Sequence, residues 1–262
     1  MKRNSRFAYV YLSIVTALTY VPIVVTVVYS FFTSASPARW EGVSLVWYAK
    51  LLKDKALWEG LKNSLILGVL ACLVAIVIGT LGALGMHRTS YRSNGFIRWV
   101  TNLPIMIPEV ILGIVYLAVF TLFRLPFGML TLVIGHATFC VPYVFLLVSG
   151  RLEGMNPSLV EAARDLGATP NQAFWHITVP EILPGIVSGL VLSFAMSFDD
   201  VVISVFVTGA NVNVLPVLIY TRLKTGVTPE INALATILIV AVVVGILVCY
   251  ELAPYLRRKY EE

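Results

Sequence analysis

Three carboxylates lie within long apolar runs of the chain, where a negative charge has a high energetic cost. Glu109 lies in a run over 99–123, and Asp199 and Asp200 are adjacent in a run over 182–208. An Asp near the centre of a bilayer costs roughly 2.5–3.5 kcal/mol on the insertion scale. Such residues persist where they face a polar cavity, pair with a cation or stay protonated. Their presence therefore predicts either a cationic ligand that binds them or a water-filled path through the membrane.

Few basic side chains could neutralise these carboxylates. The runs that hold them contain no Lys or Arg, and His136, in the neighbouring run, is the only basic candidate. We interpret His136 as a helix-packing residue that shares a hydrogen bond. The alternative for the carboxylates is that backbone groups and hydroxyls such as Ser193, Ser197 or Ser204 satisfy them.

The adjacent pair has a geometric restriction. Neighbouring residues on a helix point about 100° apart, so only one of Asp199 and Asp200 can face a pore unless the helix breaks. Ser197 to Asp200 could cap a second half-helix, which would leave a discontinuous span of the kind that lines transport sites.

The composition indicates that membrane-spanning helices position these carboxylates. Of 262 residues, 58% are hydrophobic and 13% are charged, with a mean hydropathy of +0.87, whereas soluble chains are about 25% charged. The apolar runs do not alternate as barrel strands do, and each has the roughly 20 residues that a spanning helix needs. We predict an all-α integral membrane protein, one domain over 1–262, with spans near 7–32, 63–86, 99–123, 129–150, 182–208 and 230–252.

Lys and Arg predict the orientation. With the N-terminus inside, the cytoplasmic segments hold more than half of the 19 Lys and Arg residues, as the positive-inside rule favours. Six spans then place the C-terminus inside as well. The net charge of +5 is spread between spans, which argues against nucleic-acid binding. Cys72, Cys140 and Cys249 lie in apolar runs without metal-ligand spacing, so we predict no metal site.

The second run carries small residues at intervals of four. Ala71, Ala75, Gly79 and Ala83 form one smooth stripe against which another helix can approach closely. We favour packing within the chain, with a subunit contact as the alternative.

The connection over 151–181 predicts two short helices separated by a break. Asn156 or Ser158 can cap the first, Gly167 suits its C-terminal turn, and Thr169 followed by Pro170 starts the second. The first helix has an apolar face, which requires a partner: either the chain's own bundle or another protein.

This connection resembles the coupling loop of permease subunits in bacterial ABC importers that use a binding protein. The matching residues are Glu161, Ala162, Ala163, Gly167, Ile177 and Pro180; Val179 stands where many members have Leu. The resemblance implies that the loop is cytoplasmic and docks in a groove on a separate ATPase.

The resemblance covers nearly the whole chain and is closest to the second permease subunit of spermidine/putrescine transporters. The stretches over 197–204, 206–209 and 226–236 carry it, with the Trp47-Tyr48 pair. It implies a type I importer fold in the cytoplasmic (inner) membrane, a heterodimer with a second permease, two ATPase subunits and an outer polyamine-binding protein. The chain has no P-loop sequence, so ATP and Mg²⁺ are expected on the partner subunits and no cofactor on this chain.

A polyamine carries several ammonium groups on an apolar stem. Carboxylates at different depths with aromatic surface between them would match it through charge pairing and cation–π contact. Besides Glu109, Asp199 and Asp200, we therefore assign Tyr116 and Phe198 to the substrate path.

Three other functions compete with that of a polyamine permease. A membrane-embedded enzyme is disfavoured because Asp199 and Asp200 cannot face each other and the three histidines share no helix. An ATP-independent cation channel or carrier leaves 151–181 unexplained. The same machinery with another small cationic solute, such as ferric ion or thiamine, remains the main alternative.

Overall fold

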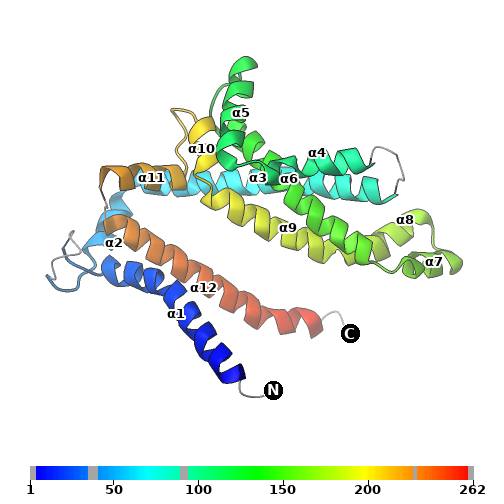
Figure 1. Ribbon diagram of the computed structural model, residues 1–262, viewed down its shortest axis with the longest axis horizontal. Coiled ribbons are helices and arrows are strands. Elements are labelled where there is room, and N and C mark those ends of the chain that lie inside the picture. The colour runs from blue at the N-terminus through cyan, green and yellow to red at the C-terminus, as the bar shows by residue number, and fades with distance from the viewer. Residues whose placement is uncertain (1–3, 35–40, 89–93, 227–228, 259–262) are drawn as a thin grey trace. The chain divides into compact units, whose positions relative to one another are not determined.

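The computed structural model describes residues 4–34, 41–88, 94–226 and 229–258 (Figure 1). In these residues the chain is helical, and its only strand-like feature is a single bridge between Phe32 and Val43. The prediction of an all-α protein is confirmed. Trp40, in the aromatic connection after the first run, lies outside the described residues.

Two compact units divide the chain: residues 58–220, and residues 1–57 with 221–262. The prediction of one domain over 1–262 is not tested by this division and stays a prediction. The larger unit contains most of α3 and the start of α11. Its elements are α3 (Lys55–Arg88), α4 (Asn94–Met106), α5 (Glu109–Leu122), α6 (Met129–Gly154), α7 (Pro157–Asp165), α8 (Pro170–Ala173), the π-helical turn η1 (Phe174–Thr178), α9 (Val179–Asp199), α10 (Val202–Val207) and α11 (Leu215–Thr225).

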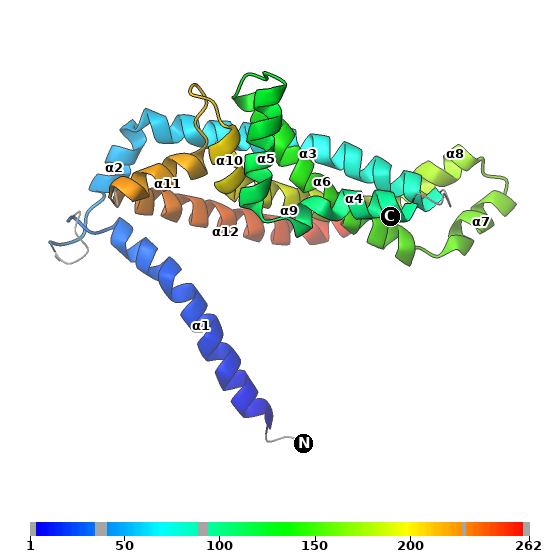
Figure 2. The same ribbon diagram turned by 45° about the horizontal axis from the view of Figure 1, so that its top comes forward.

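The smaller unit is built on the first and last long helices. It holds α1 (Asn4–Ser30), α2 (Val46–Lys53) and α12 (Pro229–Arg258), and α12 contacts both α1 and α2. Figure 2 shows that α1 and α12 diverge toward the N-terminal end of α1 and the C-terminal end of α12. Trp47 of α2 is buried and donates its indole N–H to the Phe32 carbonyl at 2.6 Å, which anchors α2 to the end of the first span.

Among the described residues, five helices are long and apolar enough to cross a membrane: α1, α3, α6, the helix over Pro170–Asp199, and α12. The pair α4 and α5 makes a sixth if it is counted as one bent span. The run over 99–123, predicted as one span, is divided between α4 and α5, which lie at 106° to each other. Pro104 lies inside α4, whereas Ile107 and Pro108 lie between the helices, because a proline forces the residue before it out of the helical region.

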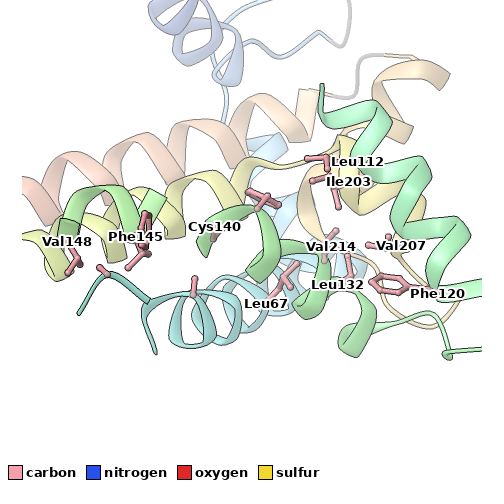
Figure 3. Close-up of a cluster of buried hydrophobic side chains, with 14 of the residues drawn as sticks. Leu67, Leu112, Phe120, Leu132, Cys140, Phe145, Val148, Ile203, Val207 and Val214 are labelled. Carbon is pink, nitrogen blue, oxygen red and sulfur yellow. The ribbon is translucent and has the colours of Figure 1, made fainter. Parts of the chain in front are cut away.

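The core of the larger unit lies where α6 packs on α9. Gly189 lies against Val144, and a Cβ on Gly185 would come within 3.0 Å of the Leu147 carbonyl oxygen, so small residues on α9 allow the close approach that membrane helices need. Around this contact the buried cluster of Figure 3 extends from Val148 and Phe145 to Leu67, Phe120 and Ile203.

The small-residue stripe of the second run packs within the chain. Ala71, Ala75, Gly79 and Ala83 are all buried on α3. A Cβ on Gly79 would come within 2.8 Å of Val144 on α6. The interpretation as intrachain packing is confirmed, and the alternative of a subunit contact at this stripe is wrong.

An ion pair joins two connections of the smaller unit. Arg222 donates from both terminal nitrogens to the carboxylate of Asp54, with Nη2 and Oδ1 3.1 Å apart. Asp54 lies between α2 and α3, and Arg222 lies in α11. The hydrogen bond from Arg222 is the largest cause that lowers the pKa of Asp54 below its ordinary value.

We expect Asp54→Asn to lower the free energy of unfolding by about 1 kcal/mol at neutral pH, because a two-point charged contact becomes a weaker one. A carboxylate with a lowered pKa stabilises the fold above its unfolded pKa, and this contribution is lost as the pH falls through the lowered value. Thermal unfolding of the purified protein should therefore show a constant difference near neutrality that shrinks below about pH 4. Glu59→Gln, at an exposed site, is the control; a difference independent of pH would contradict the assignment.

Candidate functional site

Two of the apolar runs are discontinuous, and each break lies beside an acidic residue. The first break lies between α4 and α5 and is followed directly by Glu109. The second lies between α9 and α10; α9 ends at Asp199 and Asp200 has extended backbone dihedrals. The sequence left open whether this run is broken at Ser197 to Asp200, and the structure shows that it is. Broken helices within a membrane are typical of transport sites.

The second halves of the two broken runs pack on each other. Gly113 of α5 faces Phe206 of α10 so closely that a Cβ at position 113 would overlap its ring. The two breaks thus belong to one packed assembly of α5, α6 and α10. Glu109 and Asp199 are both exposed at its edges.

Asp200 differs from its neighbour. Its side chain is almost fully buried, and its two carboxylate oxygens accept the backbone N–H groups of Ile203 and Ser204 at 3.2 and 2.8 Å. These donors belong to the first turn of α10, where helices have N–H groups without an internal partner. The Asp200 side chain therefore caps the start of α10 after the break.

His136 completes this buried polar group. Its ring is fully buried in α6, with Nδ1 2.8 Å from the Ser197 hydroxyl and Nε2 3.0 Å from the Ser204 hydroxyl. Nε2 also lies 3.4 Å from Oδ2 of Asp200. The prediction of a helix-packing histidine is confirmed. Backbone N–H groups and the imidazole of His136 satisfy Asp200, while the Ser197 and Ser204 hydroxyls pair with His136. Of the adjacent pair, only Asp199 is exposed.

The two aromatic residues assigned to the path lie in packed positions. Tyr116 stacks on Phe120, with ring centroids 6.0 Å apart, and its ring faces Gly135 of α6. Phe198 is half-buried and stacks on Phe194 at 5.8 Å. Their role in a substrate path stays a prediction.

The connection over 151–181 folds into a helical hairpin that we call the coupling hairpin (residues 156–178). The Asn156 side chain accepts the Ser158 N–H, so Asn156 is the cap of the two candidates for the first helix. Gly167 has a φ of +91° after α7, a conformation that favours glycine. Thr169 caps α8 in a reciprocal arrangement with Gln172, as its position before Pro170 predicts.

An open groove lies along one face of the coupling hairpin. Its volume is about 450 Å³, and its lining combines small and apolar side chains with two polar ones: Ala163, Leu166, Gly167, Ala168, Gln172, Ala173, His176 and Ile177. Three predicted coupling residues, Ala163, Gly167 and Ile177, are brought together here. The other three, Glu161, Ala162 and Pro180, are exposed outside the groove lining. The coupling role of all six stays a prediction.

Two features of the hairpin are not evident from the motif. Leu166 is 90% exposed, an unusual position for a large apolar side chain. The second arm continues through a π-helical turn, Phe174–Thr178, into α9, so that one helical segment of 30 residues runs from Pro170 to Asp199. Single π-turns are frequent at functional sites.

In the described part of the chain no cluster of three metal-ligating side chains occurs.

The sequence of the chain matches a known family over most of its length. The model of the binding-protein-dependent transport system inner membrane component matches residues 75–262. The spermidine/putrescine transport system permease protein PotC of Escherichia coli (strain K12) is 37% identical over 230 residues, which are 88% of this chain and 87% of that protein. The putrescine transport system permease protein PotI of the same organism is 40% identical over 243 residues, 89% and 86% of the two chains.

Solved structures show the same fold at lower identity. A chain of a bacterial ABC transporter involved in the import of the acidic polysaccharide alginate superposes with a TM-score of 0.72 at 17% identity, covering 97% of this chain and 98% of that one. A chain of the MetNI methionine ABC transporter gives a TM-score of 0.58 at 19% identity, over 79% and 95%. This chain belongs to the family of binding-protein-dependent transport system inner membrane components.

Proposed function

We propose that this chain is one of two homologous permease subunits of an ATP-driven importer that carries polyamines across the cytoplasmic membrane. Two relatives with 37% and 40% identity over most of both chains are named as spermidine/putrescine and putrescine permeases. The observation that carries the mechanism is the helical segment from Pro170 to Asp199, which joins the coupling hairpin to an exposed carboxylate at a helix break.

The chemistry of the breaks supports a cationic solute. Glu109 and Asp199 offer carboxylates that no ion pair occupies within the described residues, while Asp200 is held by α10 and His136. Each ammonium group of a polyamine can exchange water for such a carboxylate, and the apolar stem can lie along Phe198. Anions would be repelled by the same groups.

ATP and Mg²⁺ are bound by two ATPase subunits in this proposal, and the coupling hairpin docks on one of them. Ala163, Gly167 and Ile177 meet in the groove, Leu166 supplies an exposed apolar contact, and Glu161 supplies charge. A displacement of the hairpin would move α9 because the segment is continuous over roughly 45 Å at 1.5 Å per residue. The break after Asp199 then allows α9 to move relative to α10.

The proposed orientation places both termini and the coupling hairpin in the cytoplasm. The connections over 33–62 and 209–229 then face the outside, where the binding protein delivers its solute. This arrangement follows the distribution of Lys and Arg.

The decisive experiment is reconstitution of the chain with its second permease, its ATPase subunits and its binding protein. We expect spermidine or putrescine on the binding protein to stimulate ATP hydrolysis and to be taken up. Stimulation by thiamine or ferric ion instead would assign the other cationic solute. Isolation of the chain without any ATPase, when all subunits are co-expressed, would contradict the importer.

Glu161→Lys should uncouple ATP hydrolysis from uptake while the protein stays inserted, because it reverses a charge on the docking face. We expect uptake to fall by about tenfold or more. Glu153→Lys makes the same charge change on α6, where Glu153 pairs with Arg98 at the exposed surface, and should leave uptake nearly normal. Normal uptake in Glu161→Lys would remove Glu161 from the coupling contact.

Asp199→Asn and Asp200→Asn should separate transport from folding. Asp199→Asn should assemble normally and lower kcat/KM for uptake by about tenfold, because one charge-assisted contact with an ammonium group is lost. Asp200→Asn loses one acceptor for the N–H groups of α10 and should lower the melting temperature. Uptake and melting should be measured on both. Unchanged uptake kinetics in Asp199→Asn would take Asp199 off the path.

A further inference from the structure

A second cavity lies on another face of the coupling hairpin, toward the end of α3. Its volume is about 370 Å³, and two guanidinium groups line it, Arg88 and Arg164. The other lining residues come from the two arms of the hairpin: Val160, Pro170, Asn171, Ala173, Phe174 and Thr178. We call it the basic cavity. It shares only Ala173 with the groove that holds the coupling residues.

Helical spacing explains why the two cavities are separate. Val160 and Arg164 are four residues apart and lie on one side of α7, while Ala163 and Leu166 lie on another. In the second arm, Phe174 and Thr178 share the side that faces the basic cavity. Apart from Ala173, a partner in the first groove therefore does not contact the side chains that line the second.

The basic cavity has an excess of positive charge. Neither Arg88 nor Arg164 forms an ion pair with a carboxylate in the residues that the structure describes. Glu161 and Asp165, which flank Arg164 on α7, do not line the cavity. Asn171 adds an amide N–H donor at the same wall. Two planar guanidinium forks with an amide donor match the oxygens of a phosphate group.

The position of Arg88 is fixed by an aromatic contact. Its guanidinium carbon lies 4.8 Å from the ring centroid of Phe174, within the range of a cation–π interaction. Phe174 is in edge contact with Trp175, with centroids 5.2 Å apart, and Trp175 is 59% exposed. Arg88 is the last residue of the apolar helix α3. With α3 as a span, this group would lie near the headgroup layer, a position that Trp side chains favour.

We propose that the basic cavity binds a phosphate group, and that its source is the headgroup of an anionic phospholipid of the inner leaflet. Basic pockets between membrane helices on the cytoplasmic side bind such headgroups, and this cavity lies between the end of one apolar helix and the hairpin. The bound headgroup would join the end of α3 to both arms of the coupling hairpin and so hold the hairpin against the span that supports it. This proposal rests on the proposed function only in placing the hairpin on the cytoplasmic side.

The test measures lipid retention on the assembled transporter, so it does not depend on which solute is carried. The complex is reconstituted in nanodiscs of phosphatidylcholine mixed with phosphatidylglycerol, and native mass spectrometry counts the lipids that stay bound. We expect preferential retention of phosphatidylglycerol by the wild type. The double variant Arg88→Gln with Arg164→Gln should retain it about tenfold less.

A matched control removes two positive charges elsewhere on the same side. Arg98→Gln with Arg151→Gln leaves the basic cavity intact and should retain phosphatidylglycerol as the wild type does. Arg88→Lys with Arg164→Lys keeps the charge and guards against a folding defect; it should retain more lipid than the glutamine variant. Co-purification of the ATPase subunits reports assembly for every variant.

A soluble source is distinguished by inorganic phosphate. If phosphate raises the melting temperature of the detergent-purified wild type, but not of the glutamine variant, while phosphatidylglycerol is not retained, the phosphate site stands and its lipid source is wrong. Equal responses of the wild type, the control and the glutamine variant to both ligands would overturn the proposal. If the reconstituted wild type takes up no polyamine but retains phosphatidylglycerol as expected, that result would instead count against the proposed function.

Discussion

The backbone of a broken helix must find hydrogen-bond partners inside the membrane, and the side chain of Asp200 supplies them for α10. Lipid offers none, so a free N–H group at that depth has a high cost. The carboxylate accepts the N–H groups of Ile203 and Ser204, and it lies beside His136, which is itself paired with two hydroxyls. Without this buried polar group the run over 182–208 would be more stable as one uninterrupted helix, and the break beside Asp199 would be lost.

The remaining architecture follows from keeping that break in place. His136 comes from α6, which also packs along α9 through glycines. The same helix thus fixes α9, the first half of the broken run, by close packing, and it fixes the junction with α10 by hydrogen bonds. On the other side, α10 is covered by α5 through the contact of Phe206 with Gly113, so the two discontinuous runs stabilise each other.

Much of this arrangement could be predicted from single-residue properties. The apolar runs give the long helices, the cap residues Asn156 and Thr169 give the hairpin, and the adjacent acids mark a break. These signals are local, because each depends on hydropathy or on a hydrogen bond within a few residues. The angle of 106° between α4 and α5 is not local, since Pro108 ends a helix without setting the direction of the next one.

The difference between Asp199 and Asp200 could not be predicted from the sequence either, because it depends on contacts with a distant helix. The sequence restricts the pair to different directions, but the choice depends on which side His136 approaches from, 64 residues earlier in the chain. The basic cavity has the same origin. Arg88 and Arg164 are far apart in the sequence, and only the contact of Arg88 with Phe174 brings them to one wall.

Continuity and interruption have complementary uses along the segment from Pro170 to Asp199. A helix without a break transmits displacement along its axis, because its backbone hydrogen bonds resist compression, whereas a break lets two halves move relative to each other. The segment is continuous from the hairpin to its last residue, and the interruption comes at the point where an exposed carboxylate lies. The π-helical turn lies near the other end, in the second arm of the hairpin, so α9 lies between two places where the helix departs from regular geometry. In the proposed importer, a force applied at the hairpin would reach this junction through α9, whose Ser197 hydroxyl lies 2.8 Å from Nδ1 of His136, and would change the exposure of Asp199.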